Sequence, residues 1–197
     1  YSLETTHLWD PGADFEWVAD QGRYEATGFN DYFWMVGSEA LESTGSVYIE
    51  TRGYWFDDDD GLGAVLLTPG GDFYVAEVSN DYDGSAFSTR YDGIVRYAGV
   101  PNDHLQGEYT LFLGDVVDTA YGLRVGLWAH NGYLELIVNG ESLGATPWPD
   151  SGVQGVGIGS LANQTSQFEY LWVSSERPAA DFEPDQVTSP ATAAPIL

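Results

Sequence analysis

Two alternating runs separated by an Asn-Gly pair dominate the middle of the sequence. Apolar side chains alternate with other residues in 123–128 (LRVGLW), and the alternation resumes in 134–138 (LELIV). Residues 131–132 between them are Asn-Gly, a pair that tolerates the positive φ of a tight two-residue turn. A second Asn-Gly follows directly at 139–140. This part of the chain therefore predicts antiparallel strands joined by short turns.

Most of the remaining chain consists of similar short runs, bounded by Gly, Pro, Asp and Asn. An apolar period of 3.6 persists almost nowhere, so we expect very little helix, at most a turn at 38–43. About a dozen short strands of this kind predict an all-β, antiparallel, two-sheet β-sandwich. Besides the runs above, strands are expected at 15–17, 24–26, 31–36, 47–56, 62–68, 73–78, 90–97, 108–113, 141–144, 155–159 and 167–174.

The composition changes abruptly at residue 177, where Pro, Ala, Thr and Ser become frequent. The 197-residue chain is long enough to bury a full core. We therefore expect one β-sandwich domain over 1–176 and a tail over 177–197. Two interpretations of the tail stay open: a solvated linker, and an arm that packs on a neighbouring subunit.

The charge balance is extreme, with 31 acidic residues against 6 basic ones and a net charge of −25. All the basic residues are Arg, and the chain has no Lys and no Cys. Such a surface repels nucleic acid and anionic membranes, so neither is an expected partner. No apolar run is long enough for membrane insertion. We expect an extracellular or cell-surface protein that works in high salt, or else an acidic secreted protein that its charge keeps soluble.

Four parts of the chain resemble the concanavalin A-like lectin/glucanase superfamily, in the form of laminin G-like jelly-roll domains. They are Phe15-x-Trp17 with Gly22-x-Tyr24, the run 121–125 with 134–140 (LELIVNG), the strand 155–159 (GVGIG), and the closing run 168–173 (FEYLWV). The resemblance implies two packed, curved antiparallel sheets. Only by analogy does it imply a role connected with glycans.

Hydrolases of this superfamily commonly carry a Glu-x-Asp-x-x-Glu strand, which this sequence lacks. Glu77, Glu135 and Glu169 stand singly on expected strands, although a carboxylate pair between strands remains an open possibility. The histidines lack metal-hydrolase spacing, and no Gly-x-Ser-x-Gly motif marks a nucleophile. We therefore predict that the protein is not an enzyme.

Aromatic side chains next to expected turns are candidates for stacking on a sugar ring. They are Tyr54, Trp55, Tyr82, Trp128 and Trp148. Their alternative role is to cover the ends of the sandwich core. Trp148, which stands between Pro147 and Pro149, is expected to be the most exposed of them.

Two acidic turns could supply the oxygen ligands that calcium needs. One contains Asp57, Asp58, Asp59 and Asp60, and the other contains Asp81 and Asp83. In so acidic a chain, either can equally be a solvated turn. Asn163 begins an Asn-x-Thr acceptor sequence for glycosylation.

These observations favour a non-catalytic extracellular β-sandwich that binds carbohydrate or another surface ligand, with calcium as a candidate cofactor. The alternative is a structural subunit of an extracellular assembly, such as a filament, sheath or virion surface, in which copies join through their terminal segments. A glycoside hydrolase or lyase with atypical carboxylates is a minor alternative.

Overall fold

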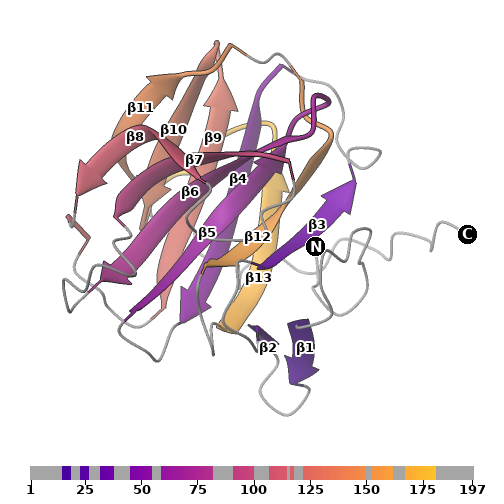
Figure 1. Ribbon diagram of the computed structural model, residues 1–197, viewed down its shortest axis with the longest axis vertical. Helices are drawn as coiled ribbons and strands as arrows, with labels where there is room; N and C mark the ends of the chain where they lie inside the picture. Colours follow the sequence, from indigo (N-terminus) through magenta and orange to yellow (C-terminus); the bar gives the residue numbers. More distant parts are fainter. Residues whose placement is uncertain are drawn as a thin grey trace, which may run out of the picture.

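A computed structural model of the chain contains thirteen strands, with no helix among the residues that it describes (Figure 1). No described segment is therefore a long apolar helix that could cross a membrane. The residues described are 15–18, 23–26, 32–37, 45–54, 59–81, 91–99, 107–114, 116–117, 122–149, 152–161 and 167–180.

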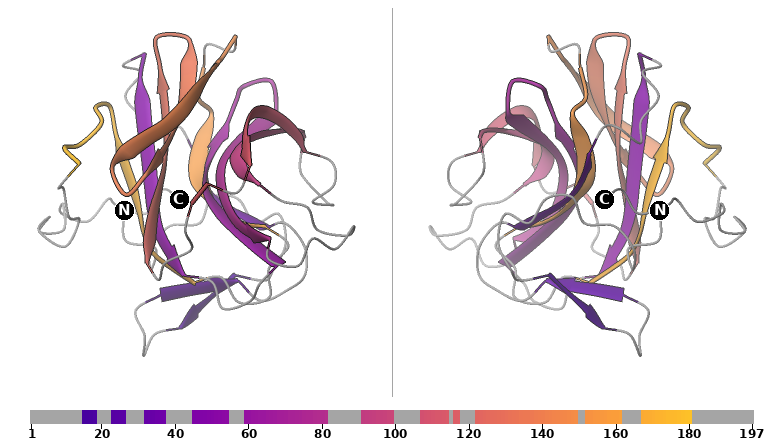
Figure 2. Two further views of the ribbon diagram at one scale, coloured as in Figure 1. Left: turned by 90° about the vertical axis from the view of Figure 1, so that its left-hand side faces the viewer. Right: turned by 90° about the vertical axis from the view of Figure 1, so that its right-hand side faces the viewer.

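The strands form two antiparallel sheets that pack face to face (Figure 2). The first, named the hairpin sheet, has the order β1-β2-β13-β4-β9-β10-β11. Its strands are β1 (Phe15–Val18), β2 (Arg23–Ala26), β4 (Val47–Tyr54), β9 (Leu123–His130), β10 (Tyr133–Val138), β11 (Glu141–Pro147) and β13 (Gln167–Ser174).

The second sheet, named the curved sheet, has the order β3-β12-β5-β6-β7-β8. Its ends bend away from the hairpin sheet, so its outer face is concave (Figure 2). Its strands are β3 (Tyr32–Gly37), β5 (Asp59–Leu67), β6 (Asp72–Asp81), β7 (Asp92–Ala98), β8 (Glu108–Gly114) and β12 (Gly155–Leu161). The predicted two-sheet antiparallel sandwich is confirmed.

The two Asn-Gly turns have the conformation that their sequence predicts. Asn131 has a φ of 49° and Asn139 a φ of 50°, and each is followed by a glycine with positive φ. β9 and β10 pair without a register shift from Tyr133 opposite His130 to Val138 opposite Val125. The turns therefore set which side chains of β9 and β10 face the other sheet.

Alternate residues of the central strands fill the space between the sheets. Ile49, Leu66, Leu127 and Ile158 belong to this core and have no exposed surface. Successive side chains of a strand point to opposite faces, so one set from each sheet meets in the middle. The same alternation decides which residues reach the two outer faces.

The outer face of the curved sheet carries a second buried apolar cluster. Its members are Val65, Leu67, Phe73, Val75, Val95 and Tyr97, with the half-buried Tyr109 packed against them. β5 to β7 are therefore apolar on both faces. This explains why 62–68 and 73–78 read as nearly continuous apolar runs rather than alternating ones.

The chain continues past β13 across the outer face of the hairpin sheet (Figure 2). Arg177 Nη2 donates a hydrogen bond to the Gly140 carbonyl, and Arg124 Nη2 donates to the Ala180 carbonyl at 2.8 Å. Residues 177–180, at the start of the predicted tail, thus contact the hairpin sheet. Arg177 belongs to this segment, and Arg124 on β9 binds its backbone.

Candidate functional site

Several predicted site residues lie outside the described part of the chain: Trp55, Asp57, Asp58, Tyr82, Asp83 and Asn163. Only the backbone is described for Asp59, Asp60 and Asp81. Asp59 pairs with Asp81 in the β5–β6 register, so the two predicted acidic turns adjoin the same end of neighbouring strands. No group of metal-ligating side chains occurs among those that the structure describes. The calcium site stays a prediction.

Trp148 was expected to be exposed, and this expectation is wrong. Its side chain is only 8% exposed and belongs to the core between the sheets. The flanking prolines do not hold it outward, because the Trp148 N–H donates a 2.7 Å hydrogen bond to the Gly132 carbonyl and ties the end of β11 to the turn. Its ring therefore covers the core, the alternative role that turn-adjacent aromatics can have.

Trp128 lies on the outer face of the hairpin sheet, where the chain itself occupies its ring. The His130 ring stacks on it with centroids 3.7 Å apart and an angle of 18° between the planes. The Arg177 guanidinium carbon lies 6.0 Å from the Trp128 ring centroid, within range of a cation–π contact. The Trp128 ring is therefore covered by side chains of its own chain and is not an open sugar platform.

Glu135 joins this cluster from β10. His130 Nε2 lies 3.0 Å from Glu135 Oε2, and Arg177 Nη1 lies 3.4 Å from Glu135 Oε1. Both carboxylate oxygens are therefore engaged by groups of the same chain. The cluster attaches residues 175–180 to the sheet rather than offering a free acid for catalysis.

Replacing Arg177 by Ala should release residues 175–180 from the hairpin sheet. The variant loses the contacts to Glu135, Gly140 and Trp128 and leaves the half-buried Glu135 carboxylate with His130 as its remaining partner. We expect a loss of about 1–3 kcal/mol in the free energy of unfolding. Urea unfolding measures that loss, and amide hydrogen exchange measures the release. Arg177→Lys keeps the positive charge but lacks the planar guanidinium, so its stability should fall between those of the wild type and Arg177→Ala. Unchanged hydrogen exchange of residues 175–180 in Arg177→Ala would contradict the attachment.

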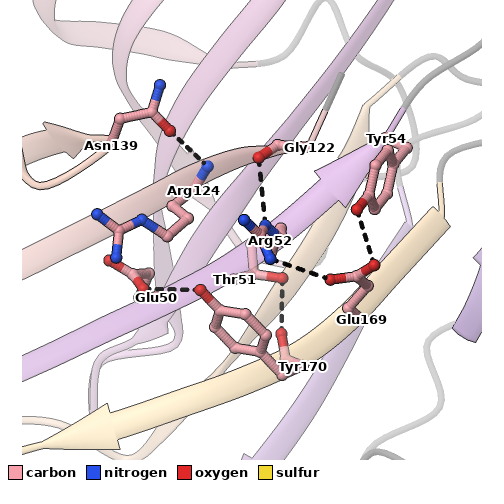
Figure 3. A network of polar contacts seen from close by, with 9 residues as sticks. All are labelled: Glu50, Thr51, Arg52, Tyr54, Gly122, Arg124, Asn139, Glu169 and Tyr170. Atoms are coloured by element: carbon pink, nitrogen blue, oxygen red, sulfur yellow. Dashed lines mark hydrogen bonds and ion pairs between the residues drawn. The ribbon is translucent and has the colours of Figure 1, made fainter. Parts of the chain in front are cut away.

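Tyr54 also lies on the outer face of the hairpin sheet, within a network of polar contacts (Figure 3). Its hydroxyl donates a 2.7 Å hydrogen bond to Glu169 Oε1. Arg52 Nη1 lies 3.7 Å from Glu169 Oε2, and Arg52 Nε donates to the Gly122 carbonyl. The polar end of Tyr54 is thus committed to the network.

A buried carboxylate stands at the other end of the same network. Glu50 is 1% exposed and accepts hydrogen bonds from the hydroxyls of Tyr48, at 2.6 Å, and Tyr170, at 2.8 Å. Arg124 lies beside it (Figure 3). Burial raises the pKa of both tyrosines above the ordinary value of 10.0, and the Glu50 carboxylate raises each pKa further.

These shifted pKa values predict a loss of stability at high pH. A tyrosine whose folded pKa exceeds its unfolded pKa of 10.0 contributes stability that is complete below pH 10.0 and is lost as pH rises above it. Each such group contributes a fall of about 1.4 kcal/mol per pH unit to the free energy of unfolding. The chain has no Lys to titrate in the same range. Tyr170→Phe should reduce the slope measured by urea unfolding by about 1.4 kcal/mol per pH unit, and an unchanged slope would contradict this origin.

The carboxylates that could have formed a catalytic pair lie apart. Glu135 is on β10 and Glu169 on β13, with β4 and β9 between them. Three strand spacings separate them by about 14 Å, whereas a retaining pair needs about 5 Å. Glu77 alternates with core residues of β6 and lies on the outer face of the curved sheet, on the other side of the molecule. These three acids do not assemble a hydrolase site.

An aromatic cluster on the curved sheet is the candidate site that the sequence did not indicate. Phe112 on edge strand β8 is 58% exposed. Its ring centroid lies 4.8 Å from that of Tyr91 and 5.6 Å from that of Tyr109, with angles of 66° and 88° between the ring planes. The Tyr109 hydroxyl accepts from the Tyr91 N–H at 2.8 Å and donates to the Tyr91 carbonyl at 3.1 Å. This Phe112 cluster is therefore a braced and partly open aromatic surface.

Two buried glycines lie in the same register row as Phe112. Phe112 pairs with Gly93 on β7, Gly93 with Glu77 on β6, and Glu77 with Gly63 on β5. A Cβ at Gly93 would collide with the Leu111 carbonyl, and one at Gly63 with the Ala76 carbonyl. Gly93, Glu77 and Gly63 are buried, so Phe112 is the exposed residue of this row.

No protein-family model matches the chain, and no curated protein matches it. Several solved structures do match the fold of the chain. The carbohydrate binding module CBM66 from Bacillus subtilis aligns over 85% of this chain and 94% of its own, with a TM-score of 0.62 and 8% identity. The VIP36 exoplasmic/lumenal domain in its Ca²⁺-bound form covers 88% and 86%, with a TM-score of 0.55 and 9% identity. The family 7 alginate lyase AlgAT5 covers 84% of each chain, with a TM-score of 0.51 and 10% identity.

These similarities define the class of fold. The chain has the two-sheet jelly-roll β-sandwich fold of these structures, the fold that the four sequence segments indicated. The class includes both binding modules and enzymes, so the activity of this chain has to be argued from its own side chains.

Proposed function

We propose that the protein is a non-catalytic carbohydrate-binding module whose glycan contacts the concave outer face of the curved sheet at the Phe112 cluster. The observation that carries the proposal is that the Phe112 side chain is 58% exposed while its ring packs against Tyr91 and Tyr109. The C–H faces of a sugar stack on such rings, and rigid aromatics lose little conformational entropy on binding.

Two further observations support this proposal. A carbohydrate-binding module is among the solved structures with this fold, and it aligns over most of both chains. The wide separation of Glu77, Glu135 and Glu169 favours binding without hydrolysis.

A glycan array probed with the purified protein tests the proposal. Retention on at least one glycan class, without shortening of the bound glycan over prolonged incubation, is the expected result. Binding to none of the glycans would overturn the proposal, and release of shorter products would overturn its non-catalytic part. Repeating the array with a calcium chelator tests calcium assistance, which the two adjoining acidic turns and the Ca²⁺-bound state of the similar VIP36 domain support.

We place the protein outside the cell in a high-salt environment, on the strength of its net charge of −25. Salt shortens the Debye length from about 10 Å at 0.1 M to about 3 Å at 1 M and so weakens repulsion between surface carboxylates. The melting temperature should rise by at least about 5 °C between 0.1 and 2 M NaCl, the effect of a gain of roughly 2 kcal/mol. Scanning calorimetry measures the melting temperature, and a melting temperature that does not change with NaCl concentration would remove this support.

The alternative of a structural subunit has less support. Residues 177–180, the start of the predicted intersubunit arm, bind the hairpin sheet of their own chain. Light scattering in molar salt should therefore give the mass of a monomer. Polymers that disappear when residues 181–197 are removed would favour the assembly.

A further inference from the structure

We infer that Thr146, which lies on the hairpin sheet, is a positioning residue for the proposed glycan site on the curved sheet. It acts through a bulge at Thr110 in β8, the irregularity that places the rings of the Phe112 cluster on one face. This role rests on the proposed function, because it names a further residue on which the geometry of the same site depends.

The Phe112 cluster depends on the irregular register of edge strand β8. Tyr109 and Leu111 pair with neighbouring residues of β7, so Thr110 between them is an extra residue without a counterpart. In a regular strand, residues three positions apart point to opposite faces, because side chains alternate with a period of two. The extra residue shifts this alternation, so that Tyr109 and Phe112 share the outer face.

Two threonine hydroxyl groups hold the bulge in place. The Thr110 hydroxyl donates a 3.1 Å hydrogen bond to the Ile94 carbonyl on β7. The Thr146 hydroxyl, which comes from β11 of the hairpin sheet, donates a 2.8 Å hydrogen bond to the Thr110 carbonyl. A bulged residue leaves the regular ladder of backbone hydrogen bonds, so such partners are what keep its backbone in one conformation.

Thr146 is buried where the edge strands of the two sheets, β11 and β8, meet (Figure 1). The two edges pack closely, because a Cβ added at Gly144 on β11 would lie 3.2 Å from the Leu111 side chain and 3.4 Å from that of Leu113. The bulge is therefore fixed from two directions, by β7 within its own sheet and by Thr146 from the opposite sheet.

The position of the bulge determines the position of the aromatic rings. Tyr109 directly precedes Thr110, and its hydroxyl binds both the N–H and the carbonyl of Tyr91. The Phe112 ring follows two residues later and packs against both tyrosine rings. A shift of Thr110 therefore moves Tyr109 and changes the support of the exposed Phe112 ring.

Thr146→Val tests this role, because valine has nearly the shape of threonine but cannot donate the hydrogen bond to Thr110. We expect Thr146→Val to bind the best glycan from the array about two- to tenfold more weakly, the effect of losing one hydrogen bond. Thr146→Ser keeps the hydroxyl group and should bind like the wild type. Titration calorimetry measures the three affinities.

Thr51→Val is the matched control for this test. The Thr51 hydroxyl donates to the Tyr170 carbonyl, also at 2.8 Å, and joins β4 to β13 within the hairpin sheet. Thr51 and Thr146 are both buried. Thr51→Val should therefore lower the free energy of unfolding about as much as Thr146→Val while leaving glycan affinity unchanged. Equal losses of affinity in the two variants would mean general destabilisation and would overturn the positioning role.

Two measurements on the protein without glycan make the test independent of the proposed function. In Thr146→Val, NMR should show displaced Phe112 ring signals, because the ring currents of Tyr91 and Tyr109 act on them. Hydrogen exchange of the Tyr91 amide, which donates to the Tyr109 hydroxyl, should become faster. Thr51→Val should change neither quantity.

The outcomes separate the positioning role from the proposed function. Unchanged Phe112 signals and unchanged Tyr91 exchange in Thr146→Val would overturn the positioning role and leave glycan binding in place. Displaced signals with wild-type affinity would also overturn it, because the site would then not depend on the bulge. A wild-type protein that binds no glycan overturns the proposed function, whereas displaced Phe112 signals would still show that Thr146 holds the cluster.

Discussion

Replacing Phe112 by Ala should weaken glycan binding at least tenfold while the melting temperature stays within a few degrees of the wild type. The ring is 58% exposed, so its removal exposes little core and leaves no buried cavity. A stacking ring at the centre of a binding surface contributes on the order of 1.4 kcal/mol or more, which corresponds to a factor of ten. Titration calorimetry with the best glycan from the array measures the change.

Tyr133→Ala is the matched control for this prediction. Tyr133 is a large aromatic with similar exposure, 49%, but it lies on β10 of the hairpin sheet. Its removal should leave glycan affinity unchanged. Equal losses in the two variants would mean that general surface hydrophobicity causes the binding. A loss confined to Tyr133→Ala would move the site to the hairpin sheet.

Replacing Trp148 by Ala should destabilise the whole domain by about 3–5 kcal/mol, the range for removing a large buried ring. Trp148 is 8% exposed and packs within the core at the end of β11. Urea unfolding at neutral pH measures the free energy. Glycan affinity of the fraction that remains folded should equal that of the wild type, because the ring does not reach the curved sheet's outer face.

Trp148→Phe separates the effect of ring volume from the effect of the indole N–H at the same position. The indole Nε1 of Trp148 is buried without a hydrogen-bond partner, so Phe removes an unsatisfied donor while it keeps most of the ring volume. We expect the free energy of unfolding of this variant to fall by less than about 2 kcal/mol. Removing the unpaired N–H abolishes the penalty of burying it, and this gain offsets part of the lost packing. A stable Trp148→Ala protein that no longer binds glycan would restore Trp148 as a ligand contact and contradict its place in the core.

Strand positions were predictable because they depend on local pattern. The runs at 123–128 and 134–138 fall within β9 and β10, and the Asn-Gly pairs form the turns on either side of β10. Period-two alternation and residues that accept positive φ act over a few positions, so the sequence shows them directly. The pairing of β4 with β9 and β13, from distant parts of the chain, has no such local signal.

The candidate site was not predictable, and two residues show why. Phe112 lies in a run, 108–113, that reads as an ordinary strand. Its exposure depends on β8 being the edge of the curved sheet and on the bulge that places Tyr109 and Phe112 on one face. Trp148 has prolines on both sides and looked exposed, yet one hydrogen bond to Gly132 directs the chain so that the ring enters the core.

The sequence by itself determined the class of fold, the strands, the tight turns and the charge of this protein, since each of these follows from composition or from neighbours in the chain. Only the tertiary structure decided which aromatic rings are open and which are covered. Burial of a side chain depends on the order of strands in a sheet and on segments far away in sequence, such as residues 175–180 over Trp128.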